Sequence, residues 1–397
     1  MSHKITRIFH PVGQGAFYSE RHDVDGQKFN VVYDCGSFGI KRGTKVVEEA
    51  FHDNEIIDIL FVSHFDYDHI SLIPVLLNKC HIRKVVLPLL HEDILFVLSG
   101  YYRYRMASNG RLRSSAEKSL QLLNDPQSWF RGEEHRAREK VKLVFVRPDV
   151  ESVAADDLER RNQLNRAEEK FVSSQGGSII NSRSEKDAKQ LSTLLTDWMF
   201  LPYNMDYFKR NSDLVTKLIG WLNQNNYSLQ DLNNDQFYKW LFRNNGHRRQ
   251  LAQIYRSLNG SINENSMLLF SGPSQKHYQC KMSVAHYPLH PPLGRLIAQP
   301  GCLYTGDFNL KQESLHASYG SYFNRIGTVQ IPHHGSRRSF DLNNFYAQDM
   351  ICPVSYGVNN QFGHPDQVVI DGIVSAGGCP ICVTNDRISE FKEIIEL

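Results

Sequence analysis

The chain has 397 residues, and its 45 basic and 43 acidic side chains leave a net charge of +2, which does not by itself indicate nucleic-acid binding. No segment approaches the roughly 18 consecutive apolar residues of a membrane helix, and the first residues lack the apolar stretch of a secretion signal. Seven cysteines, an odd number in a chain of this size, are typical of reduced thiols. We therefore expect a cytoplasmic protein with no membrane association.

Short strands alternate with helices in the first part of the chain. The apolar patterns predict strands over 5–10, 29–36, 57–63 and 83–88, and helices over 46–54 and 70–79. Alternation of this kind favours a layered α/β architecture.

The middle of the chain has a more polar composition. We expect residues 91–262 to form an insertion within a single domain of residues 1–397. The insertion is expected to be loop-rich over 91–196 and helical over 205–260, where apolar residues recur at helical spacing.

Further strands are expected from the middle of the chain onward. The patterns predict them over 142–147, 198–202, 267–270, 302–305, 328–331 and 350–355. Residues 391–397 are expected to close the chain as a short helix.

Four metal-capable side chains directly follow the predicted strand 57–63. They are His64, Asp66, Asp68 and His69. Because a strand end is rigid, a short loop there can direct several side chains to one point. Imidazole and carboxylate ligands together suit a divalent hydrolytic metal.

Two later strands also end in residues of this kind. Asp307 follows the strand 302–305, and the pair His333 and His334 follows the strand 328–331. Ligands that converge from strand ends of two halves would build a two-metal site at the edge of an α/β sandwich.

The segment 64–69 resembles the HxHxDH signature of the metallo-β-lactamase fold, with Asp66 at the position of the second histidine. This variant is similar to the one in the hydrolase domain of the ComEC/Rec2 competence proteins and their stand-alone relatives. The further motifs of that branch occur here in the same order: Val12-Gly13-Gln14-Gly15, Tyr33-Asp34-Cys35-Gly36, Thr305-Gly306-Asp307, Pro332-His333-His334-Gly335-Ser336 and Asn360-Gln361-Phe362-Gly363-His364-Pro365. The resemblance implies a four-layer αββα fold with two divalent metal ions at its edge.

The resemblance also implies roles for individual side chains. His64 and Asp66 would hold one metal ion together with His333 or His334, Asp68 and His69 would hold the other, and Asp307 would bridge both. The usual third-motif histidine has no clear counterpart in this chain. Loose candidates for it are His277, His286 and His290.

Some of these positions have simpler interpretations. Asp66 could cap the helix that follows it. Asp34 is expected to form a turn, and a role in orienting metal ligands is the alternative. Phe65 and Tyr67 are expected to pack in the interior rather than to stack on a ligand.

The residues and the resemblance together predict a metal-dependent hydrolase, with a phosphodiesterase or nuclease that uses a hydroxide activated by two metal ions as the first choice. Because Asp66 replaces an imidazole and hardens the site, Mn²⁺ and Zn²⁺ are both expected candidates, and Mg²⁺ is possible. The predicted catalytic residues are Asp68, His334 and His364, of which a histidine would protonate the leaving oxygen or bind phosphate.

The expected substrate is a phosphodiester, with DNA or RNA as the first choice. Arginines of the insertion stand beside tyrosines, a combination that a nucleic-acid groove needs, although a solvated basic face fits equally well. The predicted substrate-binding residues are Asn360, Ser336, Arg337, Arg103 and Arg105. The alternatives are a phosphodiesterase for cyclic or linear nucleotides and a metal-binding regulatory module with little activity.

Overall fold

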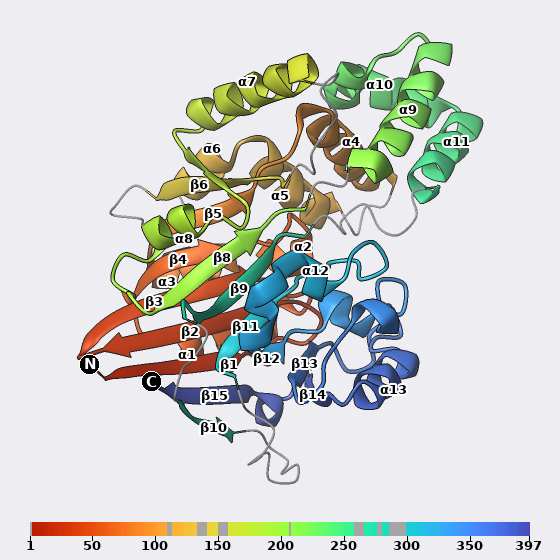
Figure 1. Ribbon diagram of the computed structural model, residues 1–397. Helices are drawn as coiled ribbons and strands as arrows, with labels where there is room; N and C mark the ends of the chain where they lie inside the picture. Colours follow the sequence, from red (N-terminus) through yellow and green to blue (C-terminus); the bar gives the residue numbers. More distant parts are fainter. Residues whose placement is uncertain are drawn as a thin grey trace.

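The chain forms an α/β protein around two mixed β-sheets, as the computed structural model shows (Figure 1). The structure describes residues 2–108, 113–132, 141–149, 158–205, 208–257, 266–275, 280–285 and 299–397. One sheet has nine strands in the order β10-β15-β1-β2-β3-β4-β5-β6-β7, and the other has six in the order β14-β13-β12-β11-β9-β8.

The strands have the following bounds. The first sheet contains β1 (His3–Phe9), β2 (Phe17–Val24), β3 (Gln27–Cys35), β4 (Ile56–Phe61), β5 (His81–Pro88), β6 (Lys142–Arg147), β7 (Ser178–Asn181), β10 (Lys281–Ala285) and β15 (Phe391–Glu396). The second sheet contains β8 (Trp198–Tyr203), β9 (Leu268–Pro273), β11 (Gly301–Tyr304), β12 (Ile326–Val329), β13 (Ile351–Ser355) and β14 (Cys379–Val383).

The two sheets pack face to face over a shared apolar core. Tyr33 of the first sheet and Tyr304 of the second have ring centroids 5.0 Å apart, and the Tyr33 hydroxyl donates to the carbonyl of Met267 across the interface. Burial of apolar area on this scale is the dominant favourable term in folding. Along β3, for example, Phe29, Val31 and Tyr33 belong to the core between the sheets and Val32 faces the helices outside, as the period of two requires.

Helices cover the outer face of each sheet. The outer core of the first sheet is shared with α1 (Ile40–Ala50), α2 (Tyr67–Ile70), α3 (Ile73–Lys79), α4 (Glu92–Ser108), α5 (Arg113–Asn124), α6 (Pro126–Arg131), α7 (Leu158–Ser174), α9 (Phe208–Gln224), η3 (Leu229–Asn233), α10 (Asp235–Arg243) and α11 (Asn245–Arg256). The outer core of the second sheet is shared with α8 (Glu185–Leu191), α12 (Leu315–Tyr319), η5 (Gly320–Arg325) and α13 (Gln367–Ser375). The short 3-10 turns η6 (Pro332–Gly335), η7 (Leu342–Asn344) and η8 (Arg387–Ser389) lie in loops. This layering confirms the predicted α/β class and is consistent with a metallo-β-lactamase-like sandwich.

A buried ionic network joins the sheets beneath this core. Arg7 is fully buried and donates to Glu20 at 2.7 Å and to Glu393 at 2.6 Å. The hydroxyl of Tyr304 also donates to Glu20, at 2.8 Å. A buried charge is tolerated only when it is paired and hydrogen-bonded. The sheets can therefore pack over Arg7 because these contacts neutralise its charge.

The expected C-terminal helix over 391–397 is wrong. Residues 391–396 form β15, which pairs antiparallel with β1 and with β10. Burial along β15 follows a period of two from Phe391 to Ile395, so the segment is a half-buried strand. A run this short carries too few residues for periodicity alone to separate strand from helix.

The expected loop-rich character of 91–196 is also wrong for the described residues. This segment contains α4, α5, α6, α7 and α8, and its strands β6 and β7 extend the first sheet. In α4, the buried residues Ile94, Val97, Leu98 and Tyr102 follow helical spacing, which the polar composition around them obscures. With β8 in the second sheet as well, the predicted insertion supplies part of the sandwich itself.

The helical segment expected over 205–260 contains α9, α10 and α11, which group with α4 and α7 at one end of the molecule (Figure 1). None of the described helices is long and apolar enough to cross a membrane. Each of the seven cysteines is a free thiol, as expected.

Candidate metal centre

The metal-capable residues meet at one edge of the sandwich, where strands of both sheets end. β4 leads into the loop that carries His64 and into α2, and the turn after β11 carries Asp307. The turn η6, after β12, carries the histidine pair. His333 and His334 both have positive φ angles, of 50° and 55°, a strained conformation that non-glycine residues adopt mainly where the surrounding structure requires it.

The first cluster consists of His64, His69 and Asp307, and all three are buried. His64 Nε2 lies 3.6 Å from Asp307 Oδ2, and His69 Nε2 lies 3.2 Å from Asp307 Oδ1. At these distances His64 Nε2, His69 Nε2 and Asp307 Oδ1 form no hydrogen bond of normal geometry, and His69 and Asp307 are an ion pair only when His69 is protonated. Three unsatisfied buried polar atoms that face one another are costly without a partner, and a divalent cation would satisfy them.

The second cluster consists of Asp68, His69 and His334, again all buried. His334 Nε2 lies 3.2 Å from Asp68 Oδ2. His69 therefore belongs to both clusters and Asp307 to one, whereas the resemblance implied that His69 would hold one metal ion and that Asp307 would bridge both. Within the described residues, these are the groups whose geometry could hold an ion.

The opposite nitrogen of each of these imidazoles is held in place. His69 donates from Nδ1 to Asp34 at 2.8 Å, and His334 donates from Nδ1 to the carbonyl of Ser355 at 2.8 Å. Ser63 Oγ donates to Asp34 at 2.7 Å, so it can accept from His64 Nδ1, which is 2.9 Å away. With Nδ1 engaged, the Nε2 atoms face the clusters in the orientation that metal ligation needs.

Asp34 is thus the residue that orients the centre, which was the alternative to its expected role as a turn former. It also accepts from the backbone N–H of Ser63 at 2.7 Å, and it lies within β3 rather than in a turn, with a φ of 54°. Ser266 adds a further support, because its Oγ accepts from the N–H of Asp307 at 2.8 Å and lies 3.1 Å from His64 Nδ1.

The ionisable groups of the site shift one another's pKa values. Burial and the neighbouring His69 lower the pKa of His64 to about 4, so its imidazole is neutral at pH 7. Burial works against the charged form of Asp307, but His333, His69 and His64 hold its pKa well below its usual value. Burial likewise opposes charge on His69, yet Asp307 and Asp34 raise its pKa well above the usual range. In the metal-free site, Asp307 and Asp34 therefore stabilise positive charge on His69, and the histidines stabilise the negative charge of Asp307.

Asp66 lies in neither cluster. Its carboxylate accepts a hydrogen bond from the hydroxyl of Tyr102 of α4 at 2.8 Å. Burial and the neighbouring Asp68 raise the pKa of Asp66 to about 6, whereas Arg105 and Tyr102 act in the opposite direction. Asp66 is the N-terminal flanking residue of α2, but its side chain makes no capping hydrogen bond, which excludes the simple capping interpretation.

His333 and His364 lie on the open side of the centre. His333 Nε2 lies 3.7 Å from Asp307 Oδ2, its Nδ1 is 2.8 Å from Ser339 Oγ, and its ring centroid is 5.9 Å from that of His364. Burial, together with His334 and His333, lowers the pKa of His364 to about 4. His277, His286 and His290 lie outside the described residues.

A cleft of 1180 Å³ opens above the centre. Loops of the sandwich form one wall, with Asp66, Asp68, Asp307, His333, His334, Ser336, Arg337, Arg338 and His364 among its residues. Helices α4, α5 and α11 form the other wall, with Tyr101, Tyr104, Arg105, Tyr255 and Arg256 among theirs. The helical segment is therefore part of the site.

Two of the predicted substrate-binding residues are not brought to this cleft. Arg103 is absent from its lining, and its guanidinium donates to Asp235 at 2.8 Å. Asn360 is also absent, and its amide donates to the carbonyls of Gly357 and His364 within its own loop. Ser336, Arg337 and Arg105 do line the cleft.

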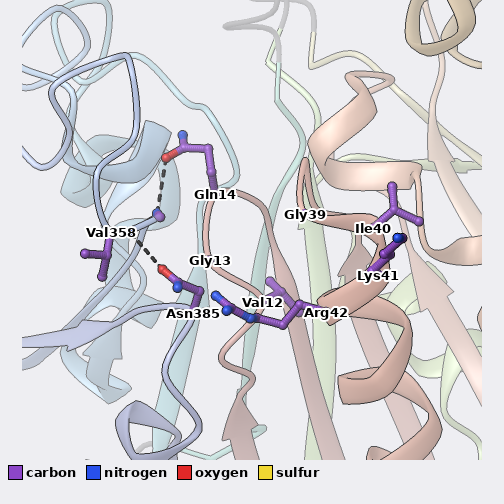
Figure 2. Close-up of a pocket in the computed structure, with 10 residues that line it drawn as sticks. Val12, Gly13, Gln14, Gly39, Ile40, Lys41, Arg42, Val358 and Asn385 are labelled. Carbon is purple, nitrogen blue, oxygen red and sulfur yellow. Dashed lines mark hydrogen bonds between the residues drawn. The ribbon is translucent and has the colours of Figure 1, made fainter.

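The turn Val12-Gly13-Gln14-Gly15 packs against the backbone of Gly36 and of Asp68, a residue of the centre. An added Cβ at Gly15 would lie 2.3 Å from the carbonyl oxygen of Gly36 and 2.9 Å from that of Asp68, so the backbones here touch directly. Figure 2 shows the adjoining pocket of 510 Å³, where the Gln14 side chain accepts from the N–H of Gly357 and Asn385 accepts from that of Val358. Gln14 lines both this pocket and the main cleft.

No protein-family model matches the chain, and no curated protein matches it. Among solved structures, the chain is similar to a long-form RNase Z from yeast, at 11% sequence identity and a TM-score of 0.23. The match covers 95% of this chain and 34% of the RNase Z chain, so this chain spans about a third of that protein. A TM-score this low says nothing about the function of this chain.

Proposed function

We propose that the protein is a metal-dependent phosphodiesterase that acts on nucleic acid, of the type found in the ComEC/Rec2 hydrolase domain. The observation that carries the proposal is the group of buried atoms without hydrogen bonds, His64 Nε2, His69 Nε2 and Asp307 Oδ1. A site that leaves such atoms facing one another, while fixing the opposite nitrogen of each imidazole, fits a cation better than any polar group of the chain itself.

In the proposed site, His64, His69 and Asp307 would hold one divalent ion, and Asp68, His69 and His334 would hold a second. When bound, such ions lower the pKa of water and offset charge at phosphorus during hydrolysis. The mixed imidazole and carboxylate donors suit Mn²⁺ and Zn²⁺, and Mg²⁺ remains a candidate. Asp66 is proposed to act beside the ligands, through its negative charge and its hydrogen bond to Tyr102.

The cleft favours a phosphodiester over a neutral substrate. Arg105 and Arg256 contribute cations from the helical wall, and Lys311, Arg337 and Arg338 contribute cations from the sandwich wall. Cations on both sides of a cleft attract the phosphate backbone of a nucleic acid. His333 and His364, on the open side of the centre, are the proposed contacts for the phosphate or the leaving oxygen.

A phosphodiesterase for a single nucleotide is the second candidate, because a cleft of 1180 Å³ also admits a ligand of that size. Salt separates the two, since binding of a polynucleotide through several phosphates weakens steeply as salt rises. A nucleotide with one or two phosphates would show a shallow dependence.

The test of the proposal is hydrolysis of bis-p-nitrophenyl phosphate and of a DNA or RNA strand with Mn²⁺ or Zn²⁺. Asp68→Asn and Asp307→Asn should each lose nearly all turnover while keeping the far-UV circular dichroism of the wild type, because each replaces a charged carboxylate ligand by a neutral amide. Turnover near that of the wild type in either variant would refute the two-metal site.

A further inference from the structure

A row of aromatic rings lies along the sandwich wall of the cleft. His364 and Phe362 are stacked, with centroids 6.0 Å apart and planes only 10° apart. Phe362 and Phe38 follow at 5.9 Å, and Phe38 and Tyr67 at 6.1 Å. All four side chains line the cleft, and they come from three segments far apart in the sequence. Tyr67, which was expected to pack in the interior, belongs to this row, whereas Phe65 is buried as expected.

The two phenylalanines at the centre of the row are unusually exposed. Phe38 is 41% exposed and Phe362 is 49% exposed. Single exposed apolar residues are common, but two rings that contact each other at the rim of a polar cleft form a patch. Neither ring is needed to fill the core, so the packing of the sandwich does not explain them.

The loop that carries Phe362 is held rigidly. Asn360 Oδ1 accepts from the N–H of Phe362 at 3.0 Å and from that of His364 at 3.1 Å. The Asn360 amide donates in turn to the carbonyl of Gly357 at 2.8 Å. These bonds order the backbone that carries the ring, and a binding site that is already ordered loses less entropy on binding.

We propose that Phe38 and Phe362 form a base-stacking subsite that takes an unpaired nucleobase of a polynucleotide strand next to the metal centre. The inference rests on the proposed phosphodiesterase function and specifies its substrate as a single-stranded region. Stacking on an aromatic ring needs an exposed base face, which a base within a duplex does not offer.

The charges around the row fit this occupant. Arg337 and Arg338 line the same wall, and Lys311 lies in the cleft as well, so a phosphate backbone that passes the metal centre would meet cations beside the rings. A cation also lies beside an aromatic ring on the helical wall, where the Arg105 guanidinium is 5.5 Å from the ring centroid of Tyr101. A protein partner with an apolar surface would not need cations on both sides.

The experiment measures binding of a single-stranded hexanucleotide with 2-aminopurine at a central position, in EDTA so that the strand stays intact. The fluorescence of this base falls when it stacks on a ring, so it reports the proposed contact directly. The wild type should quench the probe. Phe38→Ala and Phe362→Ala should abolish the quenching and raise the dissociation constant by about fivefold or more, the usual effect of losing one stacked base.

Four controls accompany these variants. Tyr346→Ala removes a ring that is 57% exposed and outside the cleft, and it should behave as the wild type does. Phe362→Trp should keep the quenching, whereas Phe362→Leu, which keeps apolar volume and guards against a folding defect, should lose it. The same probe base-paired in a duplex should show no dependence on Phe362.

Absence of quenching by the wild type, or unchanged binding by both alanine variants, would overturn the stacking subsite. If the wild type still hydrolyses bis-p-nitrophenyl phosphate with Mn²⁺, that failure concerns the subsite alone. If no diester is hydrolysed with either metal, the proposed function itself fails, whatever the fluorescence shows.

Discussion

Replacement of Asp34 by Asn should weaken metal binding without touching a metal ligand. Asp34 Oδ1 accepts from the backbone N–H of Ser63, so the amide oxygen of the variant must stay on that side. The amide nitrogen would then face His69 Nδ1, where Asp34 Oδ2 accepts at present. His69 would have to accept at Nδ1 and carry its proton on Nε2, the atom that faces the two clusters.

The expected magnitude follows from this loss of orientation. Removing the partner of a ligating histidine typically costs 10- to 100-fold in metal affinity, which corresponds to about 1.4–2.7 kcal/mol. The backbone itself should tolerate the change, since Asn adopts positive φ angles as readily as Asp, and Asp34 has a φ of 54°. Because His69 belongs to both clusters, binding of both ions should weaken.

The assay is calorimetric titration of the metal-free protein with Mn²⁺ and with Zn²⁺. Asp58→Asn is the matched control, because Asp58 is a buried carboxylate of β4 that accepts from the N–H of Asn30 and from Arg83, away from the site. The Asp34→Asn variant should bind at least about tenfold more weakly, whereas the control should bind as the wild type does. Equal affinity in all three proteins would refute the argument that Asp34 orients the centre.

Three further predictions concern other parts of the molecule. Asp66→His should raise activity with Zn²⁺ relative to Mn²⁺, since it removes a negative charge beside the proposed ligands and places an imidazole there, and an unchanged ratio would show that Asp66 does not tune the metal. Arg105→Ala should weaken binding of single-stranded nucleic acid and should reduce the slope of log K against log salt concentration by about 0.7. Arg103→Ala should change neither the affinity nor this slope, because the Arg103 side chain pairs with Asp235 outside the cleft. Glu20→Gln should make the free energy of unfolding depend less on pH in acid. Burial opposes the charge of Glu20, but Arg7 holds the pKa of Glu20 well below its usual 4.5. The stabilisation by the Glu20 carboxylate is therefore present above pH 4.5 and is lost as the pH falls below it. Thermal unfolding from pH 3 to pH 7, about the range where Glu titrates, checks this, and parallel curves for the variant and the wild type would contradict it.

The sequence revealed the metal-capable residues because each follows a buried strand. β4 is an apolar run, and polar residues directly after such a run must leave the core at one edge of the sheet. The same argument applied to Asp307 and to the histidine pair, and the structure brings these residues together. Strand ends are therefore the part of the site that local pattern predicts well.

Features that depend on distant packing could not be predicted in this way. The direction of the Asp66 side chain depends on Tyr102, which a helix of the middle segment brings to it. The contact between Phe38 and Phe362 joins residues more than three hundred positions apart. The support of His69 by Asp34 left one signal in the sequence, a carboxylate near a strand end and two residues before Gly36, but a turn explains that signal equally well.

The most direct test of the account is the metal content of the protein measured together with its activity. The metal-free chain should regain hydrolysis of a phosphodiester on addition of Mn²⁺ or Zn²⁺, with turnover that saturates near two equivalents of bound ion, as the two buried clusters predict. Less than one equivalent bound, with no hydrolysis of any diester, would contradict the account and would favour a regulatory module instead.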